Sequence, residues 1–121
     1  MGRRILKVNA EIQKYVGMII KDLNNPVIHN TIVCVNDVKT TEDLEISKIY
    51  ISVFDKDLQD EVLNQVKHSA NYIRKELAQR LDIRKVPYLE FYIDYSVEYG
   101  SKIDAVLDRI NEERKDITDE D

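Results

Sequence analysis

The stretch "HSANYIRKEL" (His68–Leu77) lies within a region whose apolar residues have the spacing of one long amphipathic helix. They recur at steps of three and four, the periodicity of an α-helix that buries one face: Leu58, Val62, Val66, Ile73, Leu77 and Leu81. Between Val66 and Ile73 this stripe offers only small or polar residues, Ser-Ala-Asn at 69–71, and basic residues follow at once. The lapse has two interpretations.

In the first, the helix stops and restarts, with Ser69 or Asn71 capping the new N-terminus. The exposed N–H groups of such a terminus favour anions, and Arg74, Lys75 and Arg80 follow it, so the stretch forms a phosphate cradle. In the second, the helix is continuous with an ordinary solvated basic face, and Ser69 and Ala70 pack against strand residues. The stretch alone favours neither interpretation.

The elements around this stretch predict a small α+β domain. Helical spacing covers 4–23, strand patterns cover 31–39, 46–54 and 87–95, and the long helical region covers 57–81. The pair Asn24–Asn25 can take left-handed conformations, and Pro26 blocks continuation of the first helix. A short polar link at 40–44 predicts an antiparallel hairpin between the first two strands.

A last helix is predicted from Ser101, because "SKID" has the form of a capping box and an apolar stripe follows it. That stripe consists of Ile103, Val106, Leu107 and Ile110. The predicted order is α-β-β-α-break-α-β-α, with helices packed on one face of a small sheet. We expect a folded domain over residues 1–110 and a solvated, frayed acidic tail over 111–121.

Composition favours one soluble domain. The 121 residues are 43% hydrophobic and 34% charged, which suits a single modest core and excludes a disordered chain. No apolar run approaches the ~20 residues of a membrane span, and the N-terminus has no signal-peptide pattern, so we expect a cytoplasmic protein. The single cysteine, Cys34, is predicted to be a small buried hydrophobe in a strand.

The charge is unevenly distributed, although the net value is only −5. Residues 67–85 hold six basic and two acidic residues, a net charge of +4, and Arg3, Arg4 and Lys7 form a second basic cluster. Residues 105–121 hold seven acidic and three basic residues, a net charge of −4. This polarity is compatible with a nucleic-acid partner in spite of the acidic total.

Catalytic motifs are absent from the sequence. The two histidines lie far apart without partners at metal spacing, and three glycines are too few for a phosphate loop. Glu90 and Asp94 share the polar face of the third strand, but their simplest role is structural. Because they repel phosphate, RNA is not expected on that face despite Tyr88 and Tyr92. We therefore expect no enzyme activity, no cofactor and no metal.

Two longer stretches resemble the ribosome-binding factor A family. One is "YIRKELAQRLDIRKVPYLEFYIDYSVEYGSKID" at 72–104, and the other joins "DLNNP" to "TIVCVNDVKTTEDLEISKIYISVF". The family pattern is matched in the first stretch at Ile73, Arg74, Leu77, Arg80, Leu81, Arg84, Pro87, Leu89, Phe91, Asp94, Ser96, Gly100 and Ile103. The second matches at Val38, Asp43, Leu44, Lys48, Tyr50, Ser52 and Val53. The likeness extends to about Ile110.

The resemblance implies a KH-like (type II) fold without the GxxG loop, in which a kink between the two middle helices replaces that loop. The family's kink carries Ala-x-Gly where this chain has Ser69, Ala70 and Asn71. Asparagine tolerates a left-handed conformation second only to glycine, so the bend is expected to survive. This favours the first interpretation of the lapse.

By resemblance, the protein is a non-catalytic assembly factor that binds the free 30S subunit and supports 16S rRNA maturation, including 5′-end processing, and growth in the cold. The resemblance assigns rRNA contacts to Arg74, Arg80 and Arg84, with Ser69, Ala70 and Asn71 at the kink. Electrostatics adds Lys67, Lys75, Lys85, Arg3, Arg4 and Lys7. We expect a monomer. The alternative is a protein-interaction module that docks on a ribosomal protein or a maturation GTPase.

Overall fold

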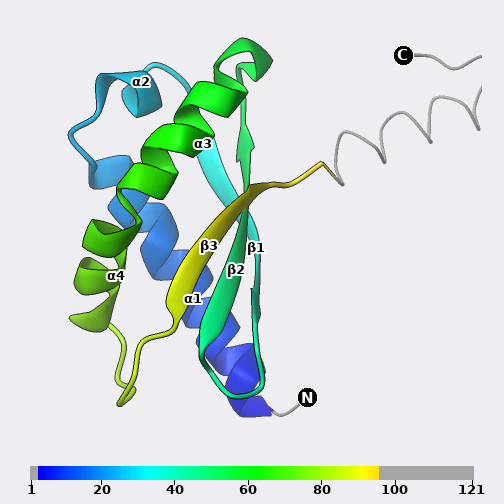
Figure 1. Ribbon diagram of the computed structural model, residues 1–121, viewed down its shortest axis with the longest axis vertical. Helices are drawn as coiled ribbons and strands as arrows, with labels where there is room; N and C mark the ends of the chain where they lie inside the picture. The colour runs from blue at the N-terminus through cyan, green and yellow to red at the C-terminus, as the bar shows by residue number, and fades with distance from the viewer. Residues whose placement is uncertain (1–2, 96–121) are drawn as a thin grey trace, which may run out of the picture.

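The computed structural model describes residues 3–95, which form an α+β domain with helices against one face of a three-stranded sheet (Figure 1). The elements in chain order are α1 (Arg3–Asp22), α2 (Pro26–His29), β1 (Val33–Thr40), β2 (Ile46–Val53), the short 3-10 helix η1 (Lys56–Leu58), α3 (Gln59–His68), α4 (Ala70–Ala78) and β3 (Tyr88–Ile93). Apart from the short helix α2, the predicted order is confirmed as far as Tyr95. The predicted helix from Ser101, the boundary at 110 and the acidic tail lie outside the described residues.

The sheet has the order β1-β2-β3. β1 and β2 are antiparallel, as predicted, and β3 pairs with β2 in parallel with Ile46 opposite Tyr88. α1 packs over β1, whereas α3 and α4 lie along β3. Ile49, Ile51 and Phe91 point into the core that these helices cover. The opposite face, which carries Tyr50 and Tyr92, is covered by no helix within residues 3–95.

The predicted break is confirmed, because α3 ends at His68 and α4 begins at Ala70. Its mechanism differs from the prediction in two ways. The Ser69 side chain makes no capping hydrogen bond, while its backbone N–H donates to the carbonyls of Gln65 and Val66. Asn71 lies inside α4, and among the described non-glycine residues only Leu44 has a positive φ. The bend therefore needs no left-handed residue.

Helix α2 was not predicted. Asn25 has an extended backbone, with φ −135°, rather than the expected left-handed one, and its side-chain oxygen caps α2 by accepting from the N–H groups of Val27 and Ile28. Pro26 occupies the first helical position, where its missing N–H costs nothing. The Asn25 amide also donates to the Gln65 side chain at 3.0 Å, which ties α2 to α3.

The prediction that Cys34 is buried was wrong. Cys34 is exposed, because strand alternation points Val33 and Val35 toward the core and Cys34 toward the uncovered face. β1 is an edge strand of a sheet covered on one side, so an apolar run along it does not mean burial on both faces.

The β1–β2 turn is organised by one hydroxyl. Thr41 Oγ1 donates to Asp43 at 2.6 Å and accepts from the N–H groups of Glu45 and Ile46, both at 3.2 Å. The nearby Leu44 has a φ of 61°, a left-handed conformation that is unfavourable for leucine. The Thr41 hydrogen bond, followed by the bond from the Glu45 N–H, lowers the pKa of Asp43 below its usual 3.8.

Thr41→Val removes this hydroxyl while keeping the side-chain shape, so the pKa of Asp43 should rise toward 3.8. A carboxyl group whose pKa is lower in the folded than in the unfolded protein stabilises the fold at pH values above the unfolded-state pKa. That stabilisation is lost as the pH falls through the folded-state pKa. The wild-type turn should therefore stay ordered to lower pH than the variant. An NMR titration of the Asp43 carboxyl measures this. Glu42→Gln is the control, and an unchanged pKa in Thr41→Val would contradict the assignment.

Candidate nucleic-acid interface

Two basic segments that are far apart in the sequence meet in one hollow. Arg4 and Lys7 from the first turns of α1 line it together with Arg84, which follows α4. The hollow has a volume of about 570 Å³, and its lining also includes Glu11 and Asp82. The packing of α1 against α4 brings the segments together. Three cations and two carboxylates give the lining a positive balance, with the three cationic side chains exposed.

The kink lies elsewhere, against β3. Lys67 and Ala70 line a separate, shallow hollow of about 290 Å³ together with Leu89, Glu90, Phe91 and Tyr92 of β3. Ala70 packs against the hydrophobic core, so the small residue at this position lets the bend approach the strand. Ser69 is half-buried, and Asn71, Lys67 and Lys75 are exposed. The structure therefore does not join the kink and the Arg84 hollow into one pocket.

Arg74 is occupied inside the protein. Its Nε donates to the carbonyls of Val86 and Pro87 at 3.3 and 3.1 Å, and its Nη2 donates to Val86 at 2.8 Å. The guanidinium also lies over the ring of Tyr88, with its carbon 4.1 Å from the ring centroid. This half-buried side chain fixes the segment between α4 and β3, which carries Arg84 and Lys85. We call the contacts of Arg74 with Val86, Pro87 and Tyr88 the Arg74 clamp.

Arg80 and Lys85 also have partners. Arg80 pairs with Glu76 one turn earlier at 3.2 Å, and Lys85 Nζ lies 2.7 Å from the Glu45 carboxylate. The hydrogen bond from Lys85 to Glu45 raises the pKa of Lys85 above 10.5. Exposed pairs of this kind contribute little free energy because water and salt screen them, so either cation can exchange its carboxylate for a phosphate at small cost.

Sequence reasoning missed the partners of these basic residues. The Glu76–Arg80 pair has a readable signal, since its members are four residues apart on one helix face. The contacts of Arg74 with Tyr88 and of Lys85 with Glu45 join residues 14 and 40 positions apart, and no local pattern marks them. Glu90 accepts a hydrogen bond from Tyr92, and Asp94 accepts one from Asn36, in line with structural roles.

No cluster of three or more histidine, cysteine, aspartate or glutamate side chains suited to a metal occurs within residues 3–95. Over the same range no helix is both long and apolar enough to cross a membrane.

Comparison with known proteins identifies the family. The family model for ribosome-binding factor A matches residues 4–107. The ribosome-binding factor A of Caldanaerobacter subterraneus subsp. tengcongensis is 31% identical over 118 residues, which cover 96% of both chains. The chain belongs to the ribosome-binding factor A family.

Solved structures of this family share the fold. The crystal structure of ribosome-binding factor A from Thermus thermophilus superposes with a TM-score of 0.66 at 20% identity, covering 74% of this chain and 94% of that one. A homology model of the T. thermophilus factor, fitted into a cryo-EM map of a 30S–RbfA complex, gives a TM-score of 0.61 at 20% identity over 72% of this chain and 91% of the other. The predicted KH-like α+β fold is thereby confirmed.

The role of the Arg74 clamp can be tested through the free energy of unfolding. Arg74→Lys keeps the charge but cannot reproduce the planar fork of donors, so the free energy of unfolding should fall by about 1–2 kcal/mol. Arg84→Lys changes an exposed arginine of the same segment and should stay within about 0.5 kcal/mol of the wild type. Urea unfolding followed by circular dichroism measures both values. Equal stability of the two variants would contradict the clamp.

Proposed function

We propose that the protein is a non-catalytic assembly factor that binds the free 30S ribosomal subunit through 16S rRNA and supports maturation of that RNA, including its 5′ end. Membership of the ribosome-binding factor A family supports this proposal, as does the 30S complex of the T. thermophilus factor. We further propose that it acts in the cytoplasm as a monomer.

The observation that carries the proposal is the convergence of Arg4, Lys7 and Arg84 on one hollow. An RNA backbone that crosses this hollow meets cations from two separate segments, α1 and the segment after α4. Each phosphate neutralised in this way releases counterions, which favours binding and makes it sensitive to salt. Glu11 and Asp82 weaken purely non-specific attraction, so the path of the backbone past the three cations matters more than total charge.

The other basic residues have graded roles in this proposal. Arg3 provides exposed charge at the start of α1, and Lys67 and Lys75 provide exposed charge on α3 and α4. Arg80 and Lys85 contribute by exchanging Glu76 and Glu45 for phosphates. Arg74 acts indirectly, because it positions the segment that presents Arg84.

The test is a charge reversal with a matched control. Arg4→Glu combined with Lys7→Glu should abolish co-sedimentation with free 30S subunits, and adding Arg84→Glu should have no further effect. Lys14→Glu combined with Lys21→Glu changes the same charge on exposed positions of the same helix and should leave binding within a few-fold of the wild type. Binding of a 16S rRNA fragment against salt should show a log–log slope about 1.4 units shallower in the first variant, roughly 0.7 per lost phosphate contact.

Equal 30S binding by the two double variants would refute the assignment of rRNA binding to this hollow. Circular dichroism spectra of both variants should match the wild type, because all four side chains are exposed.

A second candidate function is docking on a protein partner of the small subunit. Ile32 and Phe54 favour it, because they are neighbours at the open end of the β1–β2 pair and are 62% and 75% exposed. The Phe54 N–H donates to the Ile32 carbonyl at 2.9 Å, which holds the two residues side by side. Exposed large apolar residues in contact often mark interaction sites.

Ile32→Ser combined with Phe54→Ser should discriminate between the two functions. If this second function is correct, the variant should lose 30S binding by at least tenfold while its affinity for a 16S rRNA fragment and its salt slope stay unchanged. Co-sedimentation and filter binding provide the two measurements. Unchanged 30S binding would leave rRNA contact through the Arg84 hollow as the function.

A further inference from the structure

The sheet face opposite the helices is uncovered within residues 3–95, although it carries aromatic rings. We call it the open face, defined by the side chains that alternate away from the core: Cys34, Asp37, Lys39, Lys48, Tyr50, Ser52, Tyr88, Glu90 and Tyr92. Tyr50 and Tyr92 stack with their ring centroids 5.5 Å apart, and the Lys39 ammonium nitrogen lies 5.6 Å from the Tyr50 centroid. The Tyr92 side of the stack is exposed and leaves aromatic area that an apolar helix face can cover.

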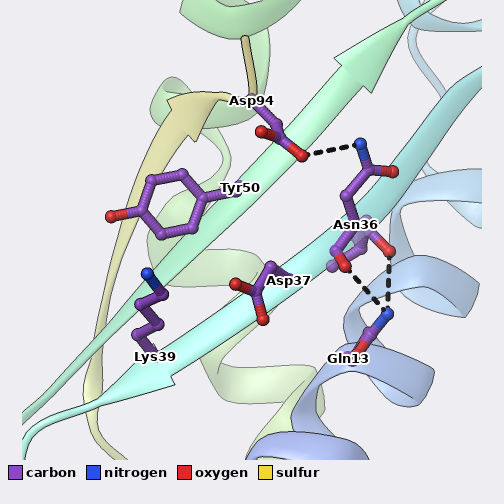
Figure 2. Close-up of a pocket in the computed structure, with 7 residues that line it drawn as sticks. Gln13, Asn36, Asp37, Lys39, Tyr50 and Asp94 are labelled. Atoms are coloured by element: carbon purple, nitrogen blue, oxygen red, sulfur yellow. Dashed lines mark hydrogen bonds between the residues drawn. The ribbon is translucent and has the colours of Figure 1, made fainter. Parts of the chain in front are cut away.

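A hollow of about 860 Å³ lies on this face, where Tyr50, Lys39 and Asp37 extend from the strands on the side away from the helices (Figure 2). One rim is the bulge in β1 at Asn36, whose amide donates to Asp94 at 3.0 Å. The Gln13 side chain reaches the β1 carbonyls from the edge, so the floor of the hollow is held in place by hydrogen bonds.

The chain leaves the described domain at the rim of this hollow. The Asp94 N–H donates to the Ile51 carbonyl at 2.7 Å, which prolongs the pairing of β3 with β2 to the edge of the hollow that Asp94 lines. A further 26 residues follow Tyr95. They include the predicted helix over 101–110, whose apolar stripe consists of Ile103, Val106, Leu107 and Ile110.

The dimensions of this segment match the open face. A ten-residue helix is about 15 Å long, and the six residues of β3 span about 20 Å. The five residues between Tyr95 and Ser101 reach at most about 17 Å, enough to cross a sheet of three strands spaced about 4.8 Å apart. The core face is already occupied by α1, α3 and α4, so the open face is the sheet surface left for this helix.

We propose that residues 101–110 fold as an amphipathic helix that docks its apolar stripe on the open face, over the Tyr50–Tyr92 stack and into the hollow beside Asp94. The domain then has helices on both faces of its sheet. An isolated helix of ten residues is only marginally stable in water, so docking on the rings supplies the burial that it needs.

The charges of the two surfaces favour this occupant over RNA. On or beside the open face, Asp37, Glu90 and Asp94 outnumber Lys39 and Lys48, so the face has no positive balance that would attract a phosphate backbone. The segment 101–110 contains two basic and two acidic residues and has no net charge, so the carboxylates of the face do not oppose it. The acidic residues after 110 stay beyond the docked helix in this arrangement.

The native thiol of Cys34 provides the test, because it lies on the open face beside the bulge and is the only cysteine in the chain. In the full chain, Leu107→Asp should raise the rate of Cys34 modification by a disulfide reagent several-fold. Ala105→Asp places the same charge on the opposite side of the predicted helix and should react at the wild-type rate. Equal rates in the two variants overturn the proposal.

A second measurement distinguishes the chain's own segment from a second copy. A nitroxide on Cys34 of the full chain should broaden the amide signals of residues 103–110, and Leu107→Asp should remove this broadening. In a mixture of isotope-labelled Cys34→Ser chain with unlabelled nitroxide-bearing chain, no broadening is expected. Broadening of residues 103–110 in the mixture assigns the open face to a second copy and overturns the proposal, as does the absence of broadening in both samples. Circular dichroism checks that the core of Leu107→Asp is intact.

Discussion

One-sided burial of a three-stranded sheet is the constraint on which the rest of this structure depends. Ile49, Ile51 and Phe91 supply one apolar face, and the helices must cover it while following the twist of the strands. One straight helix from 59 to 78 would diverge from a twisted surface. The break at Ser69 lets α3 and α4 bury their separate apolar stripes. Figure 1 shows the two helices one after the other on the same side of the sheet. The first role of the small residues Ser69 and Ala70 is therefore to let the two helices pack against the sheet.

The same packing produces the candidate interface. Because α4 lies against α1, the segment after α4 returns beside the start of α1, and Arg84 joins Arg4 and Lys7. Arg74 stabilises this arrangement by donating to the Val86 and Pro87 carbonyls. The sequence predicts Arg74 as a phosphate ligand, but in the structure Arg74 holds the segment that carries Arg84. Core packing and the proposed rRNA contact are linked through one half-buried guanidinium, so a change at Arg74 affects stability and binding together.

Much of the fold was predictable, because helices and strands here have the periodicities that one buried face imposes. The failures have local causes. The Asn25-Pro26 pair was read as a stop signal, but the same residues cap and start α2. The apolar neighbours of Cys34 indicated burial, but β1 is an edge strand with one open face. The left-handed conformation expected of Asn71 was unnecessary, because the helix breaks at Ser69, whose φ of −91° is negative.

By itself, the sequence determined the order of the main helices and strands and the two basic clusters, since each depends on residues close together in the chain. The family motifs could be read from it for the same reason. The local residues left the break near residue 69 open, and only the family motifs favoured it. Tertiary structure alone decided which basic side chains converge and which are occupied. Arg84 meets Arg4 only because two helices pack, and Arg74 turns inward only because Tyr88 and two carbonyls lie within its reach. Side-chain partners separated by many residues follow from packing, which no local pattern encodes.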